Sequence, residues 1–165
     1  MKSFLFTLLL LALAGSSFAQ KIAVKRDLIT VDRQPYARVE ADGGLMQAGQ
    51  RTFYVSSPAG ERLLVVKEMA FNDPSAAAPD NLPGRVQYVQ YLFPGTRTVT
   101  ELPMSTFGYV RLLDIARTLY AARLLRGASL DPQAVADFVA IHGTPYSARR
   151  QALDQEALFL QPVGY

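Results

Sequence analysis

The 165-residue sequence contains no cysteine and no tryptophan. Without cysteine the chain has no disulfides, thiol catalysis, iron–sulfur clusters or cysteine-based zinc sites. Small secreted domains of eukaryotes usually carry disulfides, so this absence favours a protein of the bacterial envelope. The missing tryptophan argues against a glycoside hydrolase, because such enzymes often stack sugar rings on tryptophan. Because disulfides and cysteine-based metal sites are absent, the stability of the fold must come from the burial of apolar side chains.

Charge is also sparse, because only 19% of the residues are charged and the formal net charge is +3. The basic residues are mostly arginines scattered along the chain, without a basic run. Proteins that bind nucleic acid normally present a basic patch or stripe. The sequence therefore predicts a protein that does not bind nucleic acid.

The first 19 residues have the three parts of a secretory signal peptide. Lys2 supplies the positive charge, residues 4–14 form the apolar run, and small residues precede a cut after Ala19. The run is shorter than the ~20 residues of a membrane-spanning helix, although an uncleaved anchor is the alternative. We expect cleavage between Ala19 and Gln20, export to the periplasm or outside the cell, and no stable membrane anchor afterwards.

Removing 19 residues from 165 leaves 146, which is enough chain for one domain with a single core. Its first part alternates apolar and polar residues in short runs separated by turn residues, a pattern typical of an antiparallel meander. About six or seven strands are expected, at 21–25, 28–31, 36–41, 52–56, 62–71, 85–93 and 96–102. Pro94-Gly95 fits a type II turn, with Gly95 in the position that needs a positive φ.

The segment 72–84 interrupts this pattern, because Pro74, Pro79 and Pro83 exclude a regular strand or a long helix. It is longer than a hairpin connection needs, so we expect a flexible loop. Two interpretations remain open for it. It is either a tolerated insertion or a contact loop that the prolines stiffen for a partner.

The last part of the chain changes to helical periodicity, which predicts two or three C-terminal helices and an α+β fold. The first helix is expected over 105–126, with Ser105 or Thr106 as its cap and Gly127 as its end. The second begins at the cap Asp131 and stops at Gly143. A third is expected over 147–158. Residues 20–165 are thus interpreted as one α+β domain.

Candidate catalytic groups are few. His142 is the one histidine, and the end of a helix is a common structural place for it, half-buried beneath a sheet. The serines form no nucleophile motif. Carboxylates could meet in space, and they are Glu40, Asp42, Glu68, Asp73, Asp80 and Glu101. Solvated strand and turn positions explain these more simply. The sequence therefore predicts no catalytic residue, no cofactor-binding residue and no metal ligand, and hence no cofactor.

Four tyrosines lie on the expected strands, at Tyr36, Tyr54, Tyr88 and Tyr91. Alternating aromatic residues on strands usually pack within a sheet. The alternative is an exposed aromatic face that binds a partner, because tyrosine offers contact area at a low entropic cost.

The strand pair that begins at Lys21 and its Val31-Asp32-turn-Pro35-Tyr36 reversal resemble the start of small, uncharacterised exported proteins of Gram-negative bacteria. In these proteins a sheet and two helices follow, and the second helix ends in a phrase like the 138–143 segment, Phe-Val-Ala-Ile-His-Gly. The resemblance implies a strand meander followed by helices. It implies no activity and no functional residues.

The sequence thus predicts an exported, non-enzymatic envelope module that binds a protein or a small ligand. Two alternatives stay open: a structural or folding-partner role in the envelope, and a small hydrolase that uses carboxylates or His142. An apolar cavity between sheet and helices would favour ligand binding, whereas an exposed aromatic face would favour a protein partner.

Overall fold

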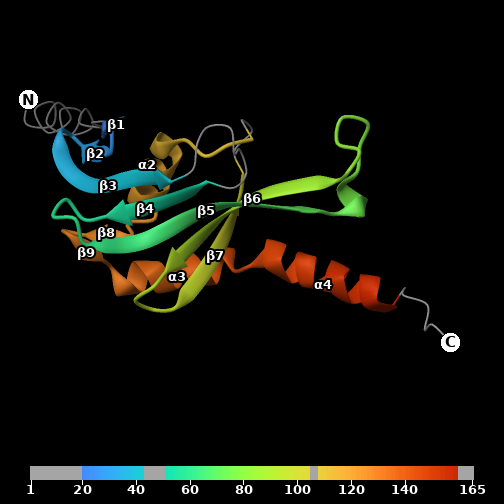
Figure 1. Cartoon of the computed structure of the whole chain (residues 1–165). Coiled ribbons are helices and arrows are strands. Elements are labelled where there is room, and N and C mark those ends of the chain that lie inside the picture. The colour runs from blue at the N-terminus through green and yellow to red at the C-terminus, as the bar shows by residue number, and fades with distance from the viewer. Residues whose placement is uncertain (1–19, 43–50, 105–107, 160–165) are drawn as a thin grey trace, which may run out of the picture.

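The computed structural model describes residues 20–42, 51–104 and 108–159. It confirms the α+β class, with a seven-stranded antiparallel sheet followed by helices (Figure 1). The strands pair in sequence order, so each lies beside its neighbour in the chain. They are β1 Ile22–Lys25, β2 Leu28–Val31, β3 Gln34–Asp42, β4 Thr52–Ser56, β5 Arg62–Asn72, β6 Arg85–Phe93 and β7 Thr98–Pro103.

The early hairpins follow from local turn chemistry. Arg26 adopts a positive φ between β1 and β2, and Asp32 and Arg33 both do so between β2 and β3. A two-residue turn with two positive φ values matches the twist of the strands it joins. The turn between β6 and β7 differs from the expectation. The left-handed conformation falls on Arg97, at φ 54°, and not on Gly95, so the type II assignment is wrong.

The first helix is shorter than expected. It is α2, Leu112–Ala121, and Arg123 then takes a φ of 52°, which ends the helix. Gly127 does not cap a helix but turns a short hairpin of β8 Leu125–Arg126 and β9 Ser129–Leu130. The chain therefore reverses where the apolar pattern alone allowed another helical turn. The expected caps at 105 and 106 lie outside the described residues.

The second and third expected helices are confirmed as α3, Pro132–His142, and α4, Pro145–Phe159. They lie against opposite faces of the sheet. Tyr91 on β6 packs edge-to-face on Phe138 of α3, whereas Tyr88 stacks on Tyr146 of α4. Residues an odd number of positions apart on a strand point to opposite faces. The chain between α3 and α4 therefore passes around the edge strand β7.

The main core lies on the α3 face. Its fully buried members come from the central strands and from α2, and they include Ile29, Val39, Phe53, Val55, Leu64, Val66, Phe93, Ile115 and Leu119. On the other face, α4 continues beyond the sheet, on the side where the ends of β5 and β6 also project (Figure 1). The segment Pro74–Ala76 at that end is a short 3-10 turn, η1.

Candidate binding groove between two helices

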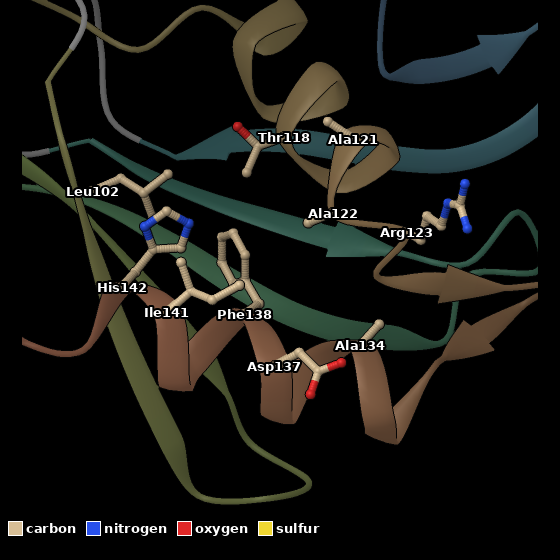
Figure 2. Close-up of a pocket in the computed structure, with 10 residues that line it drawn as sticks. All are labelled: Leu102, Thr118, Ala121, Ala122, Arg123, Ala134, Asp137, Phe138, Ile141 and His142. Carbon is tan, nitrogen blue, oxygen red and sulfur yellow. The ribbon is translucent and has the colours of Figure 1, made fainter.

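An apolar groove of about 500 Å³ lies between α2 and α3, above the edge strand β7. Figure 2 shows that the lining residues come from both helices, on either side of it. The lining residues are Leu102, Thr118, Ala121, Ala122, Arg123, Ala134, Asp137, Phe138, Ile141 and His142. Its volume falls within the range of roughly 300–1,000 Å³ typical of small-molecule sites.

The groove exists because small side chains occupy the facing positions. Ala121 ends α2, Ala122 is the residue that follows it, and Ala134 lies in the first turn of α3 on the other side of the groove. Phe138 forms the floor, where its ring packs edge-to-face on Tyr91 and Phe93 at centroid distances of 5.7 and 6.4 Å. Helices whose facing residues are alanines cannot fill the space between them, so a gap stays open above a rigid aromatic floor.

Ile141 stands at the edge of the groove with 76% of its surface exposed. A large exposed apolar side chain beside an apolar groove indicates a binding surface, because a bound molecule would remove this apolar area from water.

Polar groups occur only around the rim. The carboxylate of Asp137 accepts a hydrogen bond from Gln133 Nε2 at 2.8 Å, and the Thr118 hydroxyl points away from the floor in Figure 2. This combination of an apolar interior and a few polar rim groups is typical of a ligand site.

His142 lies at one end of the groove, and the expectation that it is half-buried beneath the sheet is wrong. It is exposed, and its ring packs edge-to-face on Phe138 at 4.8 Å. Within the described residues the imidazole makes no hydrogen bond and no ion pair. His142 is therefore a rim residue of the groove in this structure.

The carboxylates proposed for catalysis do not converge on one site. Glu68 lies on the core face, where it pairs with Arg51 at 2.6 Å and accepts from the backbone N–H of Val110 at 2.8 Å. Glu101 points to the opposite face, since its register partner is Gln90 whereas that of Glu68 is Val89. No cluster of three metal-ligating side chains is present among the described residues.

Glu101 instead anchors the start of α4. Its carboxylate is only 2% exposed and accepts from the backbone N–H groups of Tyr146 and Ser147, at 2.9 and 3.0 Å. The Ser147 hydroxyl and Gln90 Nε2 also donate to it. A carboxylate at the positive end of a helix satisfies amides that have no partner within the helix.

Asp73 provides the second anchor of α4. Arg149 donates two hydrogen bonds to its carboxylate, at 2.7 and 2.9 Å, and the backbone N–H of Ser75 donates a third. These bonds, chiefly the one from Arg149, hold the pKa of Asp73 well below its usual range. The segment that follows β5 is therefore tied to α4, which the sequence pattern did not predict.

The segment 72–84 is itself rich in internal hydrogen bonds. The Asn81 side chain ties it to the start of β6, because its amide donates to the carbonyls of Ala76 and Arg85 and its oxygen accepts from the Arg85 N–H. The backbone of Asp73 also donates to the Gly84 carbonyl at 2.8 Å. Leu82, in contrast, leaves 80% of its surface exposed.

Three of the four strand tyrosines pack within the fold. Tyr91 lies in the core, where burial raises its pKa to about 12. Tyr88 is covered by Phe71 and Tyr146, and Tyr36 donates to the Leu119 carbonyl at 3.2 Å. Tyr36 and Tyr54 are both partly exposed, and Tyr54 lies beneath the guanidinium of Arg62, 4.2 Å from its ring centroid. The four tyrosines thus do not form one exposed aromatic face.

Comparisons with protein-family models, with curated proteins and with solved structures find no match for this chain. Among the described residues, no helix is long and apolar enough to cross a membrane. The role of each groove residue is therefore argued from its geometry.

The groove residues carry little signal in the sequence. Ala121, Ala122 and Ala134 fit any helix, and which alanines face each other depends on how α2 and α3 dock. Exposed Ile141 is the one local clue, because it departs from the stripe of Val135 and Phe138 that buries α3.

Proposed function

We propose that this chain is an exported envelope protein that binds a small, mostly apolar molecule in the groove between α2 and α3. The observation that carries the proposal is the alanine-lined gap above Phe138, with a volume of about 500 Å³. The ligand would place its apolar body between Ala122 and Ala134 and its polar ends near Asp137 and Arg123. Binding without chemistry accords with a rim where His142 has no carboxylate partner among the described residues.

A small ligand is favoured over a large partner by the shape of the site. The apolar surface is concentrated inside a groove and not spread over a flat face, and Tyr88 and Tyr91 are buried where an aromatic docking face was considered. Protein interfaces usually bury about 800 Å² on each partner, which this groove alone does not offer.

The test uses 8-anilinonaphthalene-1-sulfonate, an aromatic probe that fluoresces in apolar surroundings. We expect saturable binding of one probe per chain, at least about tenfold weaker in Ala134→Phe, because a phenyl ring fills the gap. Ala140→Phe is the matched control, since Ala140 lies on the exposed side of α3 and does not line the groove. Circular dichroism and thermal melting verify that both variants fold.

Equal probe binding by Ala134→Phe and the unmodified protein would contradict the proposal, as would the absence of probe binding. A further variant, Phe159→Ala, removes a ring outside the groove that is 89% exposed, more than any other aromatic ring among the described residues. Loss of probe binding in that variant alone would place the probe on α4 and overturn the assignment to the groove.

Export has its own test. The protein recovered from an envelope or culture fraction should begin at Gln20, as determined by mass spectrometry of its N-terminal peptide. Recovery of an intact chain that begins at Met1 would contradict cleavage.

A further inference from the structure

Two further cavities adjoin the groove between α2 and α3. The first, here called the Arg123 cavity, has a volume of about 510 Å³ and shares Ala121 and Arg123 with the groove. The second, here called the Leu102 cavity, has a volume of about 280 Å³ and shares Leu102 and Thr118 with it. Figure 2 shows Arg123 at one end of the groove and Leu102 at the other. The groove is therefore the middle part of an elongated site.

One stripe of α2 borders this site. Asp114 and Thr118 line the Leu102 cavity, and Thr118 and Ala122 line the groove. Residues four positions apart lie on the same face of a helix. From Asp114 to Arg123 the stripe extends for about 13 Å, at ~1.5 Å per residue. This length suits a linear chain better than a compact ring.

The Leu102 cavity is the apolar end of the site. Val89, Pro103 and Val110 line it together with Leu102. Asp114 is its one charged lining residue within the described part of the chain, and Arg111 pairs with that carboxylate at 2.7 Å. The charge at this end is therefore compensated.

The Arg123 cavity is the polar end. Its lining includes Gln20 and Tyr36, and also Arg126 and Asp131, which pair with each other at 2.7 Å. Arg123 itself is exposed, and its side chain has no hydrogen bond and no ion pair among the described residues. One positive charge is therefore left uncompensated where this cavity meets the groove.

We propose that the groove binds an alkyl chain with one anionic head, such as a fatty-acid carboxylate. This inference rests on the proposed function, because it names the class of ligand for the same groove. The head lies beside Arg123, and the chain passes over Phe138 toward the Leu102 cavity. Asp137 attracts the opposite charge, but its carboxylate already accepts a hydrogen bond from Gln133 Nε2, whereas Arg123 has no partner among the described residues.

The first test compares octanoate, octanol and octyltrimethylammonium, which share one chain and carry a negative, a neutral or a positive head. Calorimetric titration of the purified protein measures each affinity. Octanoate should bind about fivefold more tightly than octanol, because an ion pair at an exposed position adds about that much. Butanoate should bind at least about tenfold more weakly than octanoate, because fewer methylene groups leave water.

The second test changes the charge at position 123. Asparagine and aspartate both tolerate the left-handed conformation that Arg123 adopts at a φ of 52°. Arg123→Asn should bind octanoate about fivefold more weakly and octanol unchanged. Arg123→Asp should reverse the order, so that octyltrimethylammonium binds more tightly than octanoate. Arg117→Asp is the matched control, because it changes the net charge equally from an exposed position that lines none of the three cavities, and it should keep the original order.

The outcomes separate this proposal from the proposed function. If Ala134→Phe abolishes octanol binding but the unmodified protein does not prefer octanoate, the groove binds ligands and the anionic class is contradicted. A preference for octanoate that persists in Arg123→Asp contradicts it as well. Loss of the preference in His142→Gln and not in Arg123→Asn would place the head at the opposite end of the groove and overturn the assignment. Absence of binding by all three octyl compounds would contradict both proposals.

Discussion

Helices α3 and α4 begin alike and are held differently. Each starts with a proline, and in each a carboxylate accepts hydrogen bonds from backbone amides of the first turn: Asp131 for α3 and Glu101 for α4. However, α3 buries Val135 and Phe138, whereas α4 buries none of its residues. The position of α3 is thus fixed by apolar packing and that of α4 by polar contacts at one end.

This difference shows what each kind of contact provides. Apolar burial supplies most of the free energy of folding, and in α3 the buried residues lie in the middle of the helix. The contacts of Glu101 and Asp73 are directional, so they set where α4 starts and which way it points. The start of α4 is therefore set by directional contacts, and its later turns add no buried residue.

The largest effect should come from the packed helix. We expect Phe138→Ala to lower the free energy of unfolding by about 3–5 kcal/mol, because it removes a buried ring that contacts Tyr91 and Phe93. Phe159→Ala, at a position 89% exposed, should change it by less than about 0.5 kcal/mol. Chemical denaturation of dilute protein measures both. Similar losses in the two variants would show that α4 is packed as firmly as α3.

Glu101→Gln should have the next largest effect. In the unmodified protein the backbone N–H groups of Tyr146 and Ser147 donate to the Glu101 carboxylate. In the variant an NH₂ group replaces one of its oxygens, which leaves buried N–H groups without acceptors and lowers the free energy of unfolding by about 1–3 kcal/mol. Glu40→Gln, on the exposed part of β3, is the control. Denaturation and amide exchange should show the loss concentrated in α4. If α4 keeps its protection in Glu101→Gln, the carboxylate is not its anchor.

Asp131→Ala tests the local cap of α3. The Asp131 side chain accepts from the backbone N–H groups of Gln133 and Ala134, at 3.0 and 3.3 Å. Loss of such a cap costs about 1 kcal/mol, and apolar burial should keep α3 in place. Helical content measured by circular dichroism should therefore stay nearly constant. Disappearance of α3 would show that the cap, and not Phe138, positions it.

A smaller effect should follow pH through Asp73. Its folded pKa lies below the unfolded value of about 3.9, so its ion pair with Arg149 stabilises fully above that value. The contribution is lost as the pH falls through the lowered folded pKa. Asp73→Asn should therefore be less stable than the unmodified protein at pH 7, and the difference should shrink at pH 3. A difference that is constant between these pH values would contradict the pairing.

The sequence predicted those parts of the fold that local chemistry determines. The strand pattern, the turn at Asp32 and the start of α3 at Asp131 all depend on residues within a few positions of each other. The predicted end of the first helix was wrong, because the residues around Gly127 form a hairpin where the apolar pattern also fits another helical turn.

The candidate site was less accessible to such reasoning. The Glu101 carboxylate meets amides 45 and 46 residues away, and Arg149 meets Asp73 across 76 residues. The groove depends on alanines whose neighbours are set by the docking of α2 and α3. Neither arrangement leaves a local pattern, whereas the sheet does.

The contrast between the two helices is tested most directly by hydrogen–deuterium exchange of the purified protein. Amides in α3 from Val135 to Val139 should exchange only through global unfolding, because packed residues surround them. Amides from Leu153 to Phe159 should exchange orders of magnitude faster, because no residue of α4 is buried. Equal protection of the two helices in dilute protein would contradict the view that α3 is held by packing and α4 by its first turns.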